Sequence, residues 1–262
     1  MMTLGRLADE IAGLLFPPRC QVCGELGDDL ICSSCREDMV LIAAPRCVHC
    51  GVPLPPTPAG PNLCAECRQG RDFSGARSVG LHTGSLRQAV LRYKFQRRRR
   101  LAKPLAEMLA SVFEAETSGG LPLSGCAALV PVPLYPARRA WRGFDQAELL
   151  CRRLSEIVEL PVWTDVLARI RDTQPQVELS GRERRENVRG AFEARHRYRL
   201  KGKSLILVDD VFTTGATLSA CARMLRKAGA TAVYALTVTR GVPSWHPAAL
   251  QAEPGDDRAR GR

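Results

Sequence analysis

Two acidic residues follow an apolar run, and a short loop of small hydroxyl residues comes just after them. The segment spans residues 205–217 and reads LILVDDVFTTGAT, in which Asp209 and Asp210 are the acids. In open α/β sheets, ligands bind beyond the carboxyl ends of the strands, and backbone N–H groups at a helix N-terminus bind phosphate. A phosphate cradle is therefore predicted at Thr213, Thr214, Gly215, Ala216 and Thr217. Gly215 would let the ligand come close to the backbone.

The two carboxylates indicate what else this site would hold. Two charges 4 Å apart at an effective dielectric of 20 repel by up to about 4 kcal/mol, so hydroxyl groups or a cation must compensate. A sugar phosphate meets this need, with its phosphate in the loop, its ribose diol on the acids and Mg²⁺ nearby. Neither a Walker A sequence nor a dinucleotide fingerprint occurs in the chain. The alternative is an acid pair that only caps a helix and shapes a turn, although a cap needs one acid.

A second cluster consists of cysteines. Eight of the 11 cysteines lie within residues 20–67, in four C-x-x-C knuckles. Four thiolates from two knuckles are the usual ligand set of a tetrahedral structural zinc ion, and all-cysteine sites leave no open position for catalysis. The predicted ligands are Cys20, Cys23, Cys32, Cys35, Cys47, Cys50, Cys64 and Cys67.

Zinc is favoured over the other uses of such cysteines. Disulfides are rare in the cytoplasm, the spacing differs from the usual iron–sulfur run, and a thioredoxin-like motif would need one knuckle. A segment this short cannot bury a hydrophobic core large enough to fold by itself, and bound structural zinc can supply the missing stability. The spacing predicts two zinc ions but leaves open which knuckle pairs with which. Cys126, Cys151 and Cys221 stand alone in apolar segments and are predicted to be buried core residues.

Alternating apolar runs and helical periodicities must position these groups. Strands are predicted at residues 78–82, 127–132, 205–208 and 232–238, and helices are indicated between them by apolar faces such as Leu101, Leu105 and Leu109. Apolar strands that alternate with helices are typical of a mostly parallel α/β sheet with helices on both faces. Residues 118–125 are predicted to be a loop.

Charge and hydropathy limit the classes of partner. The formal net charge is +11, and residues 1–70 hold 5 Lys or Arg against 8 Asp or Glu, so the excess of positive charge lies after residue 70. That part is expected to attract polyanions such as nucleic acid or phosphorylated metabolites. No apolar stretch is long enough for a membrane span and no secretory signal is evident, which predicts a soluble, cytoplasmic protein.

The phosphate loop resembles the 5-phosphoribosyl-1-pyrophosphate (PRPP) signature of type I phosphoribosyltransferases. The chain as a whole resembles the ComF/GntX family. Besides this loop, the stretches that carry the resemblance are FPPRCQVCG near the start, LRYKF at residues 91–95, LVPVPLYPARRAWRGFDQAELL and RDTQPQVELSGRERRENVRGAF. These stretches extend over residues 16–240. The resemblance implies residues 1–17 as a helical lead-in, 18–70 as a double zinc ribbon and 71–242 as a type I phosphoribosyltransferase-like domain. Residues 243–262 are predicted to be a disordered tail from their composition.

The resemblance also implies roles for individual residues. Asp209 and Asp210 would hold the ribose hydroxyls directly or through Mg²⁺, and the Thr-Gly loop would hold the 5′-phosphate. Residues 176–187 would form a hood over the site. The remaining implied residues are the pyrophosphate loop Pro131, Val132, Pro133 and Leu134, and the hood arginines Arg182 and Arg185.

The implied activity is pentosyl transfer from PRPP to an acceptor that the sequence does not identify, in DNA uptake during natural competence or in nucleotide metabolism. A helix N-terminus contributes only about 0.3–1 kcal/mol toward binding a charge, so basic side chains and Mg²⁺ must hold most of the pyrophosphate. The candidates are Lys94, Arg138, Arg139 and Arg142.

A second hypothesis belongs to a different class. Aromatic residues alternate with basic ones near Tyr93 and Phe95, and again near Trp141 and Phe144, a mixture that suits single-stranded DNA. On this hypothesis the chain is a non-catalytic PRPP sensor or a DNA-binding protein that contacts DNA-uptake proteins. The alternative is that Tyr93 and Phe144 face the core and that the arginines are simply solvated.

Overall fold

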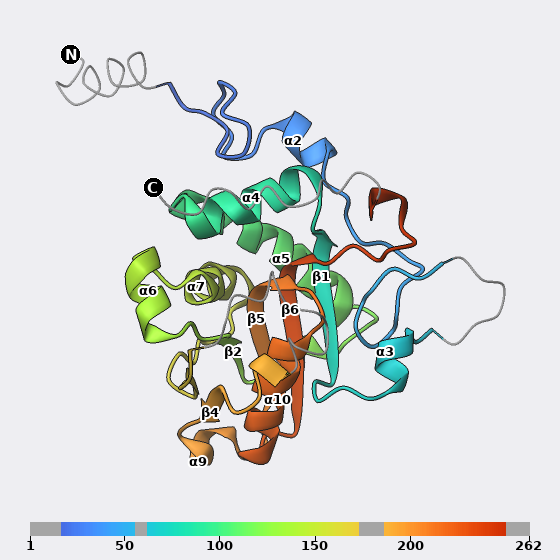
Figure 1. Cartoon of the computed structure of the whole chain (residues 1–262), viewed down its shortest axis with the longest axis vertical. Helices are drawn as coiled ribbons and strands as arrows, with labels where there is room; N and C mark the ends of the chain where they lie inside the picture. The colour runs from blue at the N-terminus through green and yellow to red at the C-terminus, as the bar shows by residue number, and fades with distance from the viewer. Residues whose placement is uncertain (1–16, 56–61, 173–185, 250–262) are drawn as a thin grey trace.

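A four-stranded parallel sheet forms the centre of the molecule. The computed structural model describes residues 17–55, 62–172 and 186–249, and the sheet consists of β1 (Gly75–Leu81), β2 (Ala128–Pro131), β5 (Ser204–Phe212) and β6 (Ala232–Arg240). The strand order is β1-β6-β5-β2 (Figure 1). Every pairing in this sheet is parallel, which confirms the predicted fold class.

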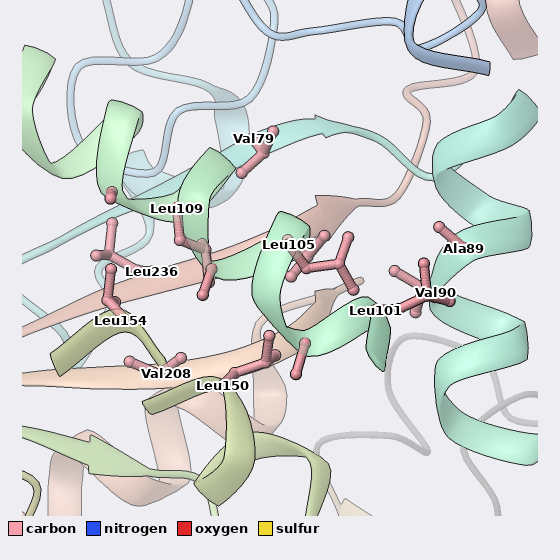
Figure 2. Close-up of a cluster of buried hydrophobic side chains, with 14 of the residues drawn as sticks. Val79, Ala89, Val90, Leu101, Leu105, Leu109, Leu150, Leu154, Val208 and Leu236 are labelled. Carbon is pink, nitrogen blue, oxygen red and sulfur yellow. The ribbon is translucent and has the colours of Figure 1, made fainter. Parts of the chain in front are cut away.

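Helices cover both faces of the sheet. On one face α5 (Ala102–Thr117) and α7 (Gln146–Val158) pack against alternate strand residues, including Val208 and Leu236 (Figure 2). On the other face α10 (Ala216–Lys227) packs with the strand residues between them, such as Leu207. Because both faces are covered, the strands are apolar throughout rather than alternating, as expected for a parallel sheet.

The strand β5 is longer than the sequence indicates. Four apolar residues were expected, but the strand runs through Ser204–Phe212, with Asp209 opposite Thr237 of β6. Acidic residues are rare inside strands, so the apolar pattern predicts a strand that stops before Asp209 and is too short. The acid pair therefore belongs to the end of the strand itself, where the sheet fixes its backbone.

Several short elements were not predicted. Helix α6 (Pro136–Arg142) follows β2, and a hairpin of β3 (Leu167–Arg169) and β4 (Phe192–Ala194) lies outside the main sheet. The 3-10 helices η1 (Arg99–Leu101), η2 (Leu123–Gly125) and η4 (Pro247–Ala249) and helix α9 (Arg197–Leu200) complete the domain. Helix η2 lies within the predicted loop at 118–125. Elements of three to seven residues carry too little periodicity to be recognised.

The two cysteine-rich ribbons flank the edge strand β1. The first carries α2 (Ser33–Glu37) and lies beside α4 (Gly84–Phe95), and the second carries α3 (Ala65–Arg68) (Figure 1). The chain that joins them bonds to the open edge of β1, where Ile42 N–H donates to the carbonyl of Val79. This cover protects an edge that would otherwise expose unpaired backbone groups.

The chain ends and one further prediction fall partly outside the described residues. The predicted lead-in helix lies almost wholly outside them, and of the predicted tail only residues 243–249, with η4, are described. Cys126, Cys151 and Cys221 are buried and unpaired, as predicted. Among the described residues, no helix combines the length and the apolar character that a bilayer crossing requires.

Candidate functional site: a carboxylate pair and phosphate loop beside two cysteine tetrads

The eight clustered cysteines form two separate tetrads. Within each tetrad the ligand atoms all lie within 4.8 Å of one another, and the members follow sequence order: Cys20, Cys23, Cys32 and Cys35, then Cys47, Cys50, Cys64 and Cys67. The sequence had left this pairing open. The Sγ–Sγ distances include 3.9 Å from Cys20 to Cys35 and 3.7 Å from Cys50 to Cys64. Four sulfurs at about 2.3 Å from one zinc ion would lie about 3.8 Å apart, so both tetrads fit tetrahedral zinc.

Backbone N–H groups surround the sulfurs. The N–H groups of Val22 and Cys32 lie 3.4 Å from Cys20 Sγ, and the N–H of Cys64 lies 3.4 Å from Cys47 Sγ. Such donors favour the thiolate form that a metal requires. Gly24, which follows the first knuckle, has a φ of 86°, and Gly51, which follows the third, has a φ of 69°, conformations that glycine adopts without strain.

Zinc should therefore be present at two equivalents per chain. Replacing one ligand, as in Cys64→Ser, is expected to reduce the content to about one, because three thiolates no longer close a structural site. Native mass spectrometry measures this count directly. The buried but isolated Cys126→Ser serves as the matched control and should keep both ions. One equivalent in the unaltered chain would contradict the assignment of two closed sites.

Asp209 and Asp210 lie together at the carboxyl end of β5 with one cation. Lys94 Nζ, from α4, lies 2.7 Å from Asp210 Oδ1, and the side chain of Asp210 is 4% exposed. The Asp210 N–H donates to Asp209 Oδ1 at 2.9 Å, and Asp210 Oδ2 is buried without a hydrogen-bond partner among the described residues. Burial and the neighbouring Asp210 raise the pKa of Asp209 to about 8. The pair is short of donors and of positive charge, which is what a metal ion or a hydroxyl-rich ligand would supply.

The small-residue loop follows the acids at the start of α10. Gly215 precedes the helix in the left-handed region at φ 76°. A Cβ at this position would lie 2.6 Å from the ring of Phe212, so both the conformation and the space require glycine. The Ala216 N–H lies 3.4 Å from Thr214 Oγ1, and the first-turn N–H groups of α10 otherwise point out of the helix. This arrangement suits a phosphate.

The predicted pyrophosphate loop lies on the neighbouring strand. Val132 N–H donates to the carbonyl of Val208 on β5 at 3.0 Å, which places the end of β2 beside the acid pair. Asp145 caps α7 by accepting from Glu148 N–H at 3.1 Å, and its other oxygen lies 3.4 Å from the N–H of Leu134. Asp145 therefore connects Leu134, the last of the predicted loop residues, to the start of α7.

The basic candidates divide into two groups. Lys94 contacts Asp210 directly, and Arg142 is partly buried, with its buried Nε and Nη1 lacking hydrogen-bond partners among the described residues. Burial lowers the pKa of Arg142, while the nearby Asp210 and Asp209 oppose this shift. Arg138 pairs with Asp172 at 3.3 Å, and Arg139 lies 3.4 Å from Glu148. The hood arginines Arg182 and Arg185, with most of residues 176–187, lie outside the described residues.

The aromatic residues of the DNA-binding hypothesis do not form one surface. Tyr93 is fully buried and donates its hydroxyl to the carbonyl of Gln146, and Phe144 packs edge-on against it. Phe95 is 36% exposed and Trp141 is 64% exposed. Tyr93 and Phe144 therefore belong to the hydrophobic core, as the alternative interpretation of these aromatic residues predicts.

Comparison with known proteins agrees with this architecture. Residues 11–68 match the double zinc ribbon domain and residues 142–246 match the phosphoribosyl transferase domain. Competence protein F of Haemophilus influenzae is 33% identical over 202 residues, which are 76% of this chain and 85% of that protein. The chain belongs to the ComF/GntX family.

Other members of the ComF/GntX family are of similar length. DNA utilization protein YhgH of Salmonella typhi is 35% identical over 213 residues, 80% of this chain and 90% of that protein. Competence protein ComFC of Bacillus subtilis is 28% identical over 221 residues, 81% of this chain and 85% of that protein. The resemblance read from the motifs is thereby confirmed at the level of the family.

In this ComF/GntX protein, three residues near the site gave no signal in the sequence. His82 Nδ1 lies 2.9 Å from Thr239 Oγ1, and burial together with Lys94 lowers the pKa of His82 to about 4, so the ring is neutral near pH 7. Arg71 donates to the carbonyl of Thr214 in the phosphate loop at 2.8 Å. Arg240, at the end of β6, is 3% exposed. Each stands outside any motif, and only the folded chain brings it to the site.

Proposed function

We propose that this protein binds PRPP together with Mg²⁺ and transfers its phosphoribosyl group to an acceptor, in DNA uptake or DNA utilisation. One observation carries the proposal: two adjacent carboxylates at the carboxyl end of a parallel strand adjoin a Thr-Gly loop that opens a helix. The DNA role rests on the names of the relatives, competence and DNA utilization proteins. Eight zinc-binding thiolates suit a reducing compartment, so we place the protein in the cytoplasm.

The proposed roles follow from the geometry of the site. The N–H groups and hydroxyls of residues 213–217 would take the 5′-phosphate, and Asp209 and Asp210 would accept hydrogen bonds from the ribose diol. Bound Mg²⁺ would neutralise charge on the pyrophosphate as it leaves. Arg142 has two buried donors without a hydrogen-bond partner in the described part of the chain, and these fit pyrophosphate oxygens.

The residues around the site support positioning and charge stabilisation rather than covalent catalysis. Departure of pyrophosphate leaves an oxocarbenium-like ribose, which adjacent carboxylates stabilise electrostatically. His82 is neutral near pH 7, and its Nδ1 is engaged by Thr239. The reaction needs no nucleophilic side chain, because the acceptor attacks the anomeric carbon itself.

Calorimetric titration of zinc-loaded protein with PRPP, with and without Mg²⁺, tests the proposal. We expect binding in the micromolar range, about 8 kcal/mol, that depends on Mg²⁺. Release of pyrophosphate on addition of a panel of nucleobases and amines would then identify the acceptor. Absence of PRPP binding by folded protein that carries both zinc ions would overturn the proposal.

A further inference from the structure

Arg240 is a buried cation whose side chain, among the described residues, has hydrogen-bond partners only on Cys50 of the second cysteine tetrad. Its Nη1 donates to the carbonyl of Cys50 at 2.7 Å, and its Nη2 lies 3.3 Å from Cys50 Sγ. Within the described part of the chain, no carboxylate pairs with it. A buried guanidinium requires a compensating negative charge. A zinc ion with four thiolates carries a net charge of about −2, so the loaded tetrad would provide that charge.

The same guanidinium also contacts the residue on which the phosphate loop rests. Its Cζ lies 3.9 Å from the centroid of the Phe212 ring, and Phe212 directly precedes Thr213. The ring fills the space beside Gly215, where an added Cβ would be 2.6 Å away. Gly241 N–H, one residue after Arg240, donates to the carbonyl of Phe212 at 2.8 Å. The position of the Arg240–Phe212 stack therefore fixes the base of the loop.

A second connection runs from the other knuckle of the same tetrad. Glu66 lies between the ligands Cys64 and Cys67 and forms an ion pair with Arg71. Arg71 Nη1 in turn donates to the carbonyl of Thr214 at 2.8 Å. Both knuckles of the second tetrad thus reach the phosphate loop, one through Arg240 and one through Arg71.

The first tetrad makes a different contact. Its neighbour Asp38 accepts from the N–H of Ser85 at 2.7 Å, at the start of α4. That helix carries Lys94 but not the phosphate loop. The two ribbons are therefore attached to different parts of the domain, and among the described residues only the second ribbon is connected to residues 213–217.

We infer that the second zinc ribbon holds the phosphate loop in its binding conformation, with Arg240 as the positioning residue between the tetrad and the loop. The inference rests on the proposed PRPP site for its consequence in binding, but the mechanical connection stands without it. Loss of zinc from the second tetrad, or loss of Arg240, releases Phe212 and with it the base of the loop. Because coupling between the binding free energies of two sites is reciprocal, PRPP in turn raises the affinity of the second tetrad for zinc.

The test compares Arg240→Met with Arg223→Met in full-length, zinc-loaded protein. Arg223 lies on α10, which follows the loop, and pairs with Asp72 at 2.8 Å on the surface, so it matches the charge change without touching the loop. Hydrogen–deuterium exchange of the peptide that contains residues 212–217 measures the loop directly. We expect at least about tenfold faster exchange in Arg240→Met only, with thermal stability of the remaining sheet retained. PRPP affinity should fall by about five- to 150-fold in the same variant, the usual range of coupling between sites.

Two further measurements separate positioning from general stability. Arg240→Lys keeps the positive charge, and we expect it to restore part of the loop protection, whereas a purely structural defect would raise exchange throughout the domain. In the unaltered protein, removal of one of the two zinc ions at equilibrium should require a higher chelator concentration when PRPP is present. Equal loop exchange in Arg240→Met, Arg223→Met and unaltered protein would overturn the inference. Failure of the unaltered protein to bind PRPP would overturn the proposed function alone, because loop exchange is measured without ligand.

Discussion

Replacing Asp209 and Asp210 together by asparagine is expected to weaken PRPP binding by at least about 100-fold. Each carboxyl group would accept a hydrogen bond from the ribose diol, and such a bond contributes about 0.5–1.5 kcal/mol, or about 1.5–3 kcal/mol where the acceptor is charged, so the pair accounts for about 3 kcal/mol. A loss of about 3 kcal/mol corresponds to a factor of about 100 in Kd. Asparagine keeps the shape of each side chain, so the strand and the backbone hydrogen bonds of β5 should remain. Calorimetry with PRPP and Mg²⁺ gives the affinity.

The control for this prediction is Asp165→Asn. Asp165 is an exposed acid that pairs with Arg199 at 2.8 Å, far along the chain from the phosphate loop. The Asp165→Asn variant should leave PRPP affinity unchanged, and all variants should keep two zinc ions per chain. Unchanged affinity in the double variant would remove the acid pair from the binding site.

The stability of a single variant gives an independent check on the acid pair. The pKa of Asp209 is raised to about 8 in the folded chain, so between about pH 4 and 8 the folded state binds more protons than the unfolded state. Stability therefore falls as pH rises through this window. Asp209→Asn removes that loss, and we expect it to raise the free energy of unfolding at pH 8 by about 0.5–2 kcal/mol, less at pH 6. A buried carboxyl group whose pKa is strongly raised is typical of a functional site.

The candidate site residues could be recognised in the sequence where they lie close together along the chain. The four knuckles could be assigned to zinc because each C-x-x-C is local, and the tetrads confirm that the ligands gather as two sets of four. The acid pair and the Thr-Gly loop likewise lie within nine residues, so one strand end and one helix start suffice to bring them together. The roles assigned to Asp209, Asp210 and residues 213–217 remain predictions.

The rest depends on contacts between distant segments. Arg240 reaches Cys50 across 190 positions of sequence, and Arg71 reaches Thr214 across 143. In the sequence these arginines cannot be told apart from the many solvated ones of a basic chain. Their burial follows from the parallel sheet, which brings the end of β6 beside the second ribbon. Long-range topology, rather than any local pattern, decides which arginines are structural.

Glu116 forms another long-range contact of this kind, and its replacement should have a large effect on stability. Its side chain is 2% exposed, lies 2.8 Å from Arg77 Nε and forms an ion pair with Arg46, which directly precedes Cys47. Burial alone would raise the pKa of Glu116, but Arg77 and Arg46 outweigh it and hold the pKa below its usual range. A carboxylate near the C-terminus of α5 opposes the helix dipole, so the two arginines must account for its charge.

Glu116→Gln should therefore destabilise the protein by about 3 kcal/mol, because the buried guanidinium of Arg77 loses the carboxylate that compensates it, and the partly exposed Arg46 loses its ion pair. Urea unfolding at pH 7 measures this difference. Glu114→Gln, two residues earlier on the exposed face of the same helix, should change the free energy of unfolding by less than about 0.5 kcal/mol. Because Arg46 and Arg77 both touch the second ribbon, Glu116→Gln should also speed zinc release from Cys47, Cys50, Cys64 and Cys67 while leaving the first tetrad unaffected. If both tetrads lost zinc at the same faster rate, the effect would be general unfolding, and Glu116 would not be the specific anchor of this ribbon.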